Sequence, residues 1–179
     1  VLSTNILLKS MKKFNIKKLL FSSSATIYGV PNYLPIDEDH KLKPVNVYGE
    51  TKLLVEKILM SMSEKYQFKV CSLRYFNPVG SYNNGEFGED HSNPSDNLMP
   101  QILNTISNPD KILNVYGDKY STSDGSAVRD YIHIMDLING HIKALENIDG
   151  KPNFKAYNLG SGRGLSLIHI SEPTRHNAI

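Results

Sequence analysis

Apolar residues in the first part of the chain recur with two different periods, and their alternation predicts an α/β fold. Residues 2–15 carry apolar side chains at helical spacing, and the short apolar run 19–22 that follows is typical of a buried strand. Residues 46–66 again show helical spacing and precede a second apolar run in 68–77. Neither run alternates polar and apolar residues, which favours strands covered on both faces. The order predicts a parallel sheet with crossover helices.

The pattern changes after Pro78, where a long segment rich in Gly, Asn, Ser and acidic residues predicts an irregular connection. Beyond it we expect a helix over 98–107 and a short strand over 112–117. The stretch 129–148 has apolar residues at helical spacing and predicts another helix. A strand over 154–159, followed by glycines, closes the pattern.

Composition and charge exclude several classes of function. Of the 179 residues 40% are hydrophobic, and the formal net charge is +2, as in ordinary soluble globular proteins. The densest basic run, 9–18, has apolar residues at helical spacing, so we expect its lysines to solvate the outer face of a helix. Aromatic residues do not alternate with the basic ones, and we therefore expect no nucleic-acid partner.

Two further features concern the compartment. No apolar run approaches the roughly 20 residues of a membrane span, and no secretory signal opens the chain, so we expect no membrane association. The single cysteine, Cys71, lies in an apolar run and is expected to be a buried thiol. Without a second cysteine there is neither a disulfide nor a thiolate zinc site, and the cytoplasm is the expected location.

The end of the chain differs in character from the rest. Residues 165–175, LSLIHISEPTR, resemble the translation of a transposase-type sequencing adapter. We therefore interpret 165–179 as a non-native tail and leave it out of the fold prediction. The alternative is a natural amphipathic end.

The most informative local pattern is a tyrosine four residues before a lysine at the start of the helix 46–66. Tyr48 and Lys52 share one face of that helix, and apolar residues continue the same stripe towards the sheet. A phenol ionises only near about pH 10 in water, which makes it a poor base at neutral pH. A lysine ammonium about 6 Å away, at an effective dielectric constant near 20, would favour the phenolate by roughly 3 kcal/mol. Such a pair suits general acid–base chemistry, although this spacing also arises by chance.

Hydroxyl groups are predicted at the same edge of the sheet. Ser22, Ser23 and Ser24 end the first strand, and ligands of open α/β sheets bind beyond the carboxyl ends of the strands. A serine run at a strand end can also be plain turn chemistry. The combination with Tyr48 and Lys52 favours a Ser–Tyr–Lys constellation.

Several motifs together resemble a known family. The motifs are FSSSATIYG, YGETK, LRYFNPVG, NLMP, DGSAVRDYIHIMDL and YNLGSG. Their order and approximate spacing resemble the extended short-chain dehydrogenase/reductase family, and their residues resemble those of its UDP-glucose 4-epimerases. The similarity runs from Val1 to about Gly164 and covers about the middle half of the family's length. It implies a partial Rossmann-like, doubly wound parallel sheet plus part of a smaller α/β substrate domain.

The resemblance implies an isomerase that interconverts UDP-glucose and UDP-galactose with NAD. Tyr48 would be the catalytic base and acid on the sugar 4′-hydroxyl, and Ser24 would hydrogen-bond the 4′-oxygen. Lys52 would bind the nicotinamide ribose and favour the Tyr48 phenolate. Ser22 and Tyr75 would contact the cofactor, as Tyr48 and Lys52 do. For Tyr75 the alternative is a core aromatic at a strand end.

The resemblance also implies four substrate contacts beyond the first two strands. Asn77 would contact the sugar, Asn97 and Arg129 the phosphates, and Tyr116 the uracil. An ordinary helix cap is the alternative for Asn97. For Arg129 the alternative is a salt bridge to Asp130 or Asp136.

The family pattern further predicts the organisation of the chain. We expect the C-terminal half of the NAD-binding domain in 1–79, part of the substrate domain in 80–130, and a helix and strand returning to the first sheet in 131–164. The family's glycine-rich fingerprint and its distal substrate residues are missing from the sequence, so we interpret the chain as a fragment that is inactive alone. The resemblance implies a homodimer.

Two alternative functions are compatible with the same fold. A nucleotide-sugar 4,6-dehydratase of the same fold would carry an Asp-Glu pair where this chain has Ala25, which disfavours it. A non-catalytic nucleotide-sugar-binding protein on the same scaffold would be free to lose Tyr48 or Lys52, and both are present.

Overall fold

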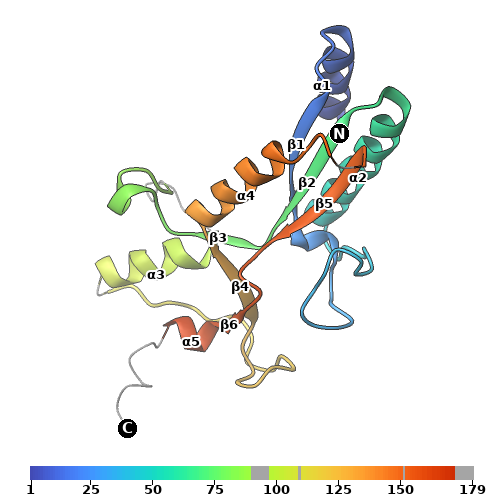
Figure 1. Ribbon diagram of the computed structural model, residues 1–179. Helices are drawn as coiled ribbons and strands as arrows, with labels where there is room; N and C mark the ends of the chain where they lie inside the picture. The colour runs from blue at the N-terminus through green and yellow to red at the C-terminus, as the bar shows by residue number, and fades with distance from the viewer. Residues whose placement is uncertain (90–96, 109, 151, 172–179) are drawn as a thin grey trace. The chain divides into compact units, whose positions relative to one another are not determined.

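The computed structural model describes residues 1–89, 97–108, 110–150 and 152–171 (Figure 1). They form two compact units, which are described one after the other. The first unit comprises Val1–Phe76 and Asp136–Gly160, and the second comprises Asn77–Met135 and Ser161–Ile179.

A parallel sheet of three strands forms the centre of the first unit and confirms the predicted fold class. Its order is β1-β2-β5, with bounds Lys18–Ser24, Lys69–Tyr75 and Phe154–Leu159. Ser24 pairs with Tyr75, and Tyr75 pairs with Leu159, so the three strands end at one edge. The predicted strands 19–22, 68–77 and 154–159 are confirmed within a few residues.

Helices cover both faces of this sheet. Alternate residues of β1 and β2, among them Ser23 and Arg74, point towards α2 (Val47–Tyr66) and contact Glu56 there. The residues between them, such as Tyr75, point towards α4 (Ile134–Glu146). A Cβ at Gly140 of α4 would lie 2.9 Å from the Leu159 side chain, so glycine permits the close approach of α4 to β5.

The apolar core of the first unit lies between the sheet and α1 (Leu2–Lys13) together with α2. Its buried members come from both helices, from β2 and from the residue before β2: Leu8, Met11, Val55, Leu59, Phe68 and Val70. The lysines of α1 are exposed, as predicted, but Leu7 and Phe14 are exposed as well. The buried face of α1 is therefore narrower than the spacing of its apolar residues suggested.

The second unit contains a small mixed sheet in the order β3-β4-β6. Strands β3 (Asn77–Val79) and β4 (Val128–His133) are parallel, and β6 (Gly164–Ser166) runs antiparallel to β4. Two helical turns and two helices complete the described part of the chain: η1 (Ala25–Ile27) in the first unit, and η2 (Asn83–Gly85), α3 (Leu98–Ser107) and α5 (Leu167–Ser171) in the second.

Two sequence predictions for residues 112–148 were wrong. The helix predicted over 129–148 begins only at Ile134, because 128–133 pair with two strands that the local spacing does not reveal. The strand predicted over 112–117 is absent, since no described segment pairs with it and Ile112 is 83% exposed. Residues 164–171, mostly left out of the prediction, form β6 and α5, where Leu165 pairs with Arg129.

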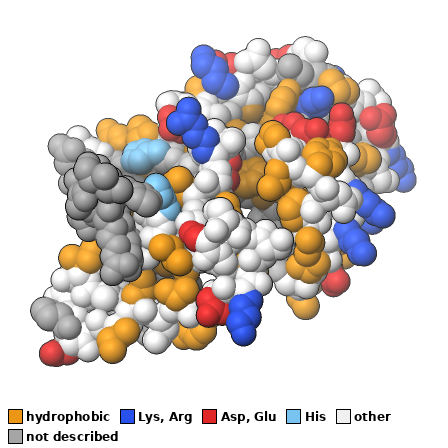
Figure 2. All heavy atoms as spheres, turned by 90° about the horizontal axis from the view of Figure 1, so that it is seen from below, with side chains coloured by type: hydrophobic (Ala, Val, Ile, Leu, Met, Phe, Trp, Pro, Cys, Tyr) orange, Lys and Arg blue, Asp and Glu red, His pale blue; other side chains and the backbone are white. Residues whose placement is uncertain are grey.

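The surface is chemically mixed. On the face shown in Figure 2, hydrophobic side chains lie scattered between charged ones. Within the described ranges, no helix has both the length and the apolar character needed to cross a bilayer.

Candidate active site

The carboxyl edge of β1 and β2 brings two of the predicted cofactor residues into direct contact. The Ser22 and Tyr75 hydroxyl oxygens are 2.7 Å apart, across neighbouring parallel strands. Ser22 is exposed and Tyr75 is half-buried, so this edge presents hydroxyl groups to solvent. Burial raises the pKa of Tyr75 above its ordinary value, although the hydrogen bond with Ser22 lowers it in part.

Ser24 forms the turn that ends β1. Its hydroxyl oxygen accepts hydrogen bonds from the Thr26 backbone N–H at 3.2 Å and from the Thr26 hydroxyl at 2.9 Å, and thereby caps η1. The turn role that the sequence offered as an alternative is therefore present. Both bonds use Ser24 as the acceptor, which leaves its own hydroxyl hydrogen able to donate.

The first turn of α2 sets the place of Tyr48. The Asn46 side chain accepts a hydrogen bond from the Gly49 N–H at 2.8 Å, which caps the helix. A Cβ at Gly49 would lie 2.7 Å from the Thr26 carbonyl oxygen, so the helix start packs directly on η1. Tyr48 itself is 55% exposed beside this contact.

Lys52 links the tyrosine to the strand edge. Its ammonium donates a hydrogen bond to the Ser22 carbonyl oxygen at 2.8 Å. The same nitrogen lies 5.4 Å from the centre of the Tyr48 ring and 5.3 Å from that of Phe21. The structure thus brings together the tyrosine and the lysine that the sequence placed on one helix face.

His141 of α4 is a site neighbour that the sequence analysis did not single out. Its Nε2 makes a short hydrogen bond with the Tyr75 hydroxyl, and its Nδ1 lies 2.8 Å from the Leu137 carbonyl oxygen. The Tyr75 hydroxyl donates to the Ser22 hydroxyl oxygen, so this tyrosine links the end of β1 to α4. The sequence showed His141 only as one position of a helical stripe.

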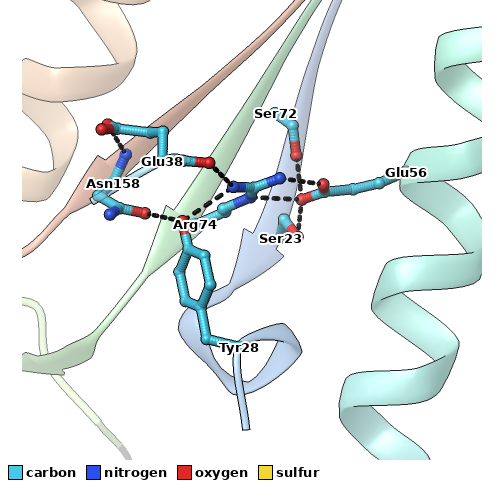
Figure 3. A network of polar contacts seen from close by, with 7 residues as sticks. All are labelled: Ser23, Tyr28, Glu38, Glu56, Ser72, Arg74 and Asn158. Carbon is cyan, nitrogen blue, oxygen red and sulfur yellow. Dashed lines mark hydrogen bonds and ion pairs between the residues drawn. The ribbon is translucent and has the colours of Figure 1, made fainter. Parts of the chain in front are cut away.

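A buried ion pair behind this edge was also missed (Figure 3). Glu56 of α2 and Arg74 of β2 are 2% and 4% exposed, and the Arg74 Nη2 lies 2.8 Å from the Glu56 Oε2. Burial alone would raise the pKa of Glu56, but hydrogen bonds from Arg74 and Ser23 hold it below its ordinary value. A charged residue inside the apolar run of β2 was the available signal, because buried arginines need a partner.

The four predicted substrate residues all lie in the second unit. Asn77 begins β3, and its side-chain amide donates to the Asp130 carbonyl oxygen at 2.8 Å. Arg129 is exposed on β4, and its Nη1 donates to the Val128 carbonyl oxygen at 3.1 Å. Tyr116 is 79% exposed in a loop.

Asn97 does not act as a helix cap and Arg129 does not form the salt bridge that the sequence allowed. Asn97 stands at the N-cap position of α3, but its side chain makes no capping hydrogen bond and donates instead to Glu89 at 3.2 Å. Among the ion pairs of the described residues, Arg129 has none with Asp130 or Asp136. Asp130 accepts instead from Ser161 and Gly162.

Fold and site together define a doubly wound α/β protein in which a helix brings a tyrosine and a lysine to the carboxyl edge of a parallel sheet. The chain belongs to the NAD dependent epimerase/dehydratase family, whose sequence profile matches residues 1–160.

Within this family the chain is similar to individual UDP-glucose 4-epimerases. The chain is 45% identical over 168 residues to a UDP-glucose 4-epimerase of Bacillus subtilis, covering 93% of this chain and 50% of that protein. A UDP-glucose 4-epimerase of Pisum sativum is 48% identical over 163 residues, covering 89% of this chain and 47% of that protein. The chain therefore spans about half the length of the curated relatives it matches.

A solved structure supports the same assignment. The UDP-glucose 4-epimerase of Bifidobacterium longum, in complex with NAD+ and UDP, superposes with a TM-score of 0.88 at 45% identity. The match covers 94% of this chain and 50% of that one.

Proposed function

We propose that the full-length protein interconverts UDP-glucose and UDP-galactose by oxidation and re-reduction at C4 of the sugar. The observation that carries the proposal is the Lys52 ammonium, held between the Ser22 carbonyl oxygen and the ring of Tyr48. Relatives at 45% and 48% identity that are named UDP-glucose 4-epimerases support the substrate class.

The residues at the strand edge fit a dinucleotide cofactor. One of the three Lys52 N–H donors goes to Ser22, so two donors can serve ribose hydroxyls. The Ser22 and Tyr75 hydroxyls add polar contacts beside it. When bound, NAD supplies the hydride acceptor and later the hydride donor for sugar C4.

The proton follows a path set by Tyr48. As a phenolate it takes the proton from the sugar 4′-hydroxyl while C4 is oxidised, and the Ser24 hydroxyl donates a hydrogen bond to the 4′-oxygen. The 4-keto sugar then rotates, and Tyr48 returns the proton when C4 is reduced on its other face. Between these two steps Tyr48 is a neutral phenol, and the adjacent Lys52 ammonium balances its negative charge before the first step and after the second.

Substrate binding is assigned to the second unit. Asn77 contacts the sugar, Asn97 and Arg129 bind the phosphates, and Tyr116 contacts the uracil. The exposed guanidinium of Arg129, which has no ion pair among the described residues, supports an anionic ligand there.

Location and assembly complete the proposal. The buried thiol of Cys71, the single cysteine of the sequence, supports the cytoplasm as the compartment. Exposed apolar side chains on α1, among them Leu2 and Ile6, and that of Phe14 at its C-cap support a homodimer.

The 4,6-dehydratase alternative remains disfavoured. Ala25, the first residue of η1, offers no carboxylate where that reaction needs an acid–base pair.

The test is Tyr48→Phe in the full-length protein. Epimerisation of UDP-galactose should fall about 1,000-fold because the proton acceptor is lost. Binding of UDP, measured by calorimetry, should stay nearly intact. An unchanged rate would reject Tyr48 as the base, and an inactive parent protein would reject the reaction.

A further inference from the structure

Three residues of α2 lie on one side of the helix at intervals of one turn. Tyr48, Lys52 and Glu56 are separated by four residues each, so their side chains follow the same stripe. The Lys52 ammonium bonds to the carbonyl oxygen of Ser22, and the Glu56 Oε1 accepts from the hydroxyl of Ser23 at 2.6 Å. Two successive turns of α2 are thus bonded to two successive residues of β1.

The Glu56 carboxylate accepts four hydrogen bonds from three residues. Besides Ser23, its Oε1 accepts from Ser72 at 2.7 Å and from the Arg74 Nε at 3.2 Å, while its Oε2 accepts from the Arg74 Nη2 at 2.8 Å. Figure 3 shows the carboxylate reaching from the helix to donors on two strands. These bonds connect α2 to β1 and to β2 at the same time.

Arg74 extends the network to the segment that precedes α2. Its Nη1 donates to the Tyr28 hydroxyl at 2.8 Å and to the Glu38 carbonyl oxygen at 3.3 Å. Tyr28 in turn donates to the Asn158 side chain of β5 at 2.6 Å. One guanidinium therefore joins the helix, the loop leading to its first turn, and the third strand.

Apolar and polar contacts hold α2 on the sheet in different ways. Val55 and Leu59 fill the core below the helix, and the hydrophobic attraction that holds them there is non-directional. Hydrogen bonds in a buried, low-dielectric site are directional and strong. A buried ion pair adds little to net stability, but it can select one conformation.

We propose that Glu56 and Arg74 are a positioning pair that fixes the register of α2 on the sheet and thereby places Tyr48 and Lys52 at the carboxyl edge. The pair acts through these two residues and does not touch the substrate. The inference rests on the proposed function of Tyr48 and Lys52.

The decisive variant combines Glu56→Met with Arg74→Met in the full-length protein. It removes both charges together, keeps the side-chain volume, and leaves no unpaired buried charge. The turnover number for UDP-galactose should fall about 100-fold, the effect expected of a displacement near 1 Å. The KM and the affinity for UDP should change by no more than about threefold. Amide hydrogen exchange at residues 47–52 should become faster.

Leu8→Ala is the matched control for lost stability. Leu8 is fully buried in the same core, on α1, and belongs to none of these hydrogen bonds. This variant should lower the melting temperature, yet its turnover number and its exchange at 47–52 should match the wild type below that temperature. An equal loss of turnover in Leu8→Ala would show that the network acts only through stability.

Other outcomes are equally decisive. If the double variant keeps wild-type turnover and wild-type exchange at 47–52, the positioning role is wrong. Should it fail to fold, Arg74→Lys gives the same test, because lysine keeps the charge but loses the fork to Glu56. A wild-type protein without epimerase activity would reject the proposed function, while exchange at 47–52 would still decide whether the pair positions the helix.

Discussion

The two units hold their candidate residues in different ways. In the first unit Lys52, Ser22 and Tyr75 are bonded to one another or to the same strand, and a buried ion pair lies behind them. In the second unit Arg129 and Tyr116 are exposed, and the Arg129 guanidinium donates to the neighbouring Val128 backbone carbonyl.

This difference matches the chemistry assigned to each unit. Proton transfer between Tyr48 and a sugar hydroxyl depends on position within a fraction of an ångström, so its residues need a rigid support. Anchoring a diphosphate depends mainly on charge, which tolerates a flexible side chain. We therefore expect substitutions in the first unit to change turnover and those in the second unit to change binding.

The largest effect after loss of Tyr48 is expected from Lys52→Met. Loss of the ammonium removes the hydrogen bond to the Ser22 carbonyl oxygen and the positive charge beside Tyr48, and turnover of UDP-galactose in steady-state kinetics should fall about 100-fold. Lys57→Met, an exposed lysine one turn further along α2, is the control and should behave as wild type. A turnover number unaffected by Lys52→Met would contradict the expectation that substitutions in the first unit change turnover.

Arg129→Leu should have the next largest effect, and on binding. Losing a charge-assisted contact to phosphate should raise the KM for UDP-galactose roughly 10-fold to 100-fold, with turnover changed much less. Lys119→Leu removes an exposed positive charge from the same unit and should leave KM unchanged. A fall in turnover without a change in KM would contradict the division between the units.

Asn77→Ala should have a smaller effect. It removes the 2.8 Å bond to the Asp130 carbonyl oxygen, worth about 1 kcal/mol of stability, together with the proposed sugar contact. Asn147→Ala removes an amide-to-carbonyl bond of equal length at the end of α4 and controls for stability alone. Urea unfolding should show comparable losses in both variants, while only Asn77→Ala should raise KM.

The sequence predicted the first unit better than the second. The strands 19–22 and 68–77 stand out as apolar runs and the helix 46–66 by its helical spacing, and each forms within a few residues of its prediction. Strand β4 was missed because its identity depends on pairing with β3 and β6, which lie far away in sequence. The local spacing of apolar residues does not show which distant strands will pair.

The candidate site shows the same division. Tyr48 and Lys52 could be paired from their spacing and Ser22 placed at a strand end, whereas the cofactor role of Tyr75 came only from the family resemblance. Glu56 was hidden because its partners come from β1 and β2, which contribute Ser23, Ser72 and Arg74 from two other segments. Arg74 did carry a signal, since a cation inside a buried strand demands a carboxylate, but the sequence does not say which one.

The smallest expected effect concerns acid stability and tests the buried pair without any substrate. The pKa of Glu56 is lowered below its model-peptide value of 4.5, so its ionised form stabilises the folded protein above that pH. This contribution should be lost as the pH falls below about 4.5 towards the lower pKa of the folded state. Urea midpoints of the full-length protein should therefore decrease more steeply between about pH 5 and pH 3 in the wild type than in the Glu56→Met, Arg74→Met variant. Both proteins share their remaining carboxylates, so parallel curves would mean that the Glu56 carboxylate is no better stabilised in the fold than in the unfolded chain.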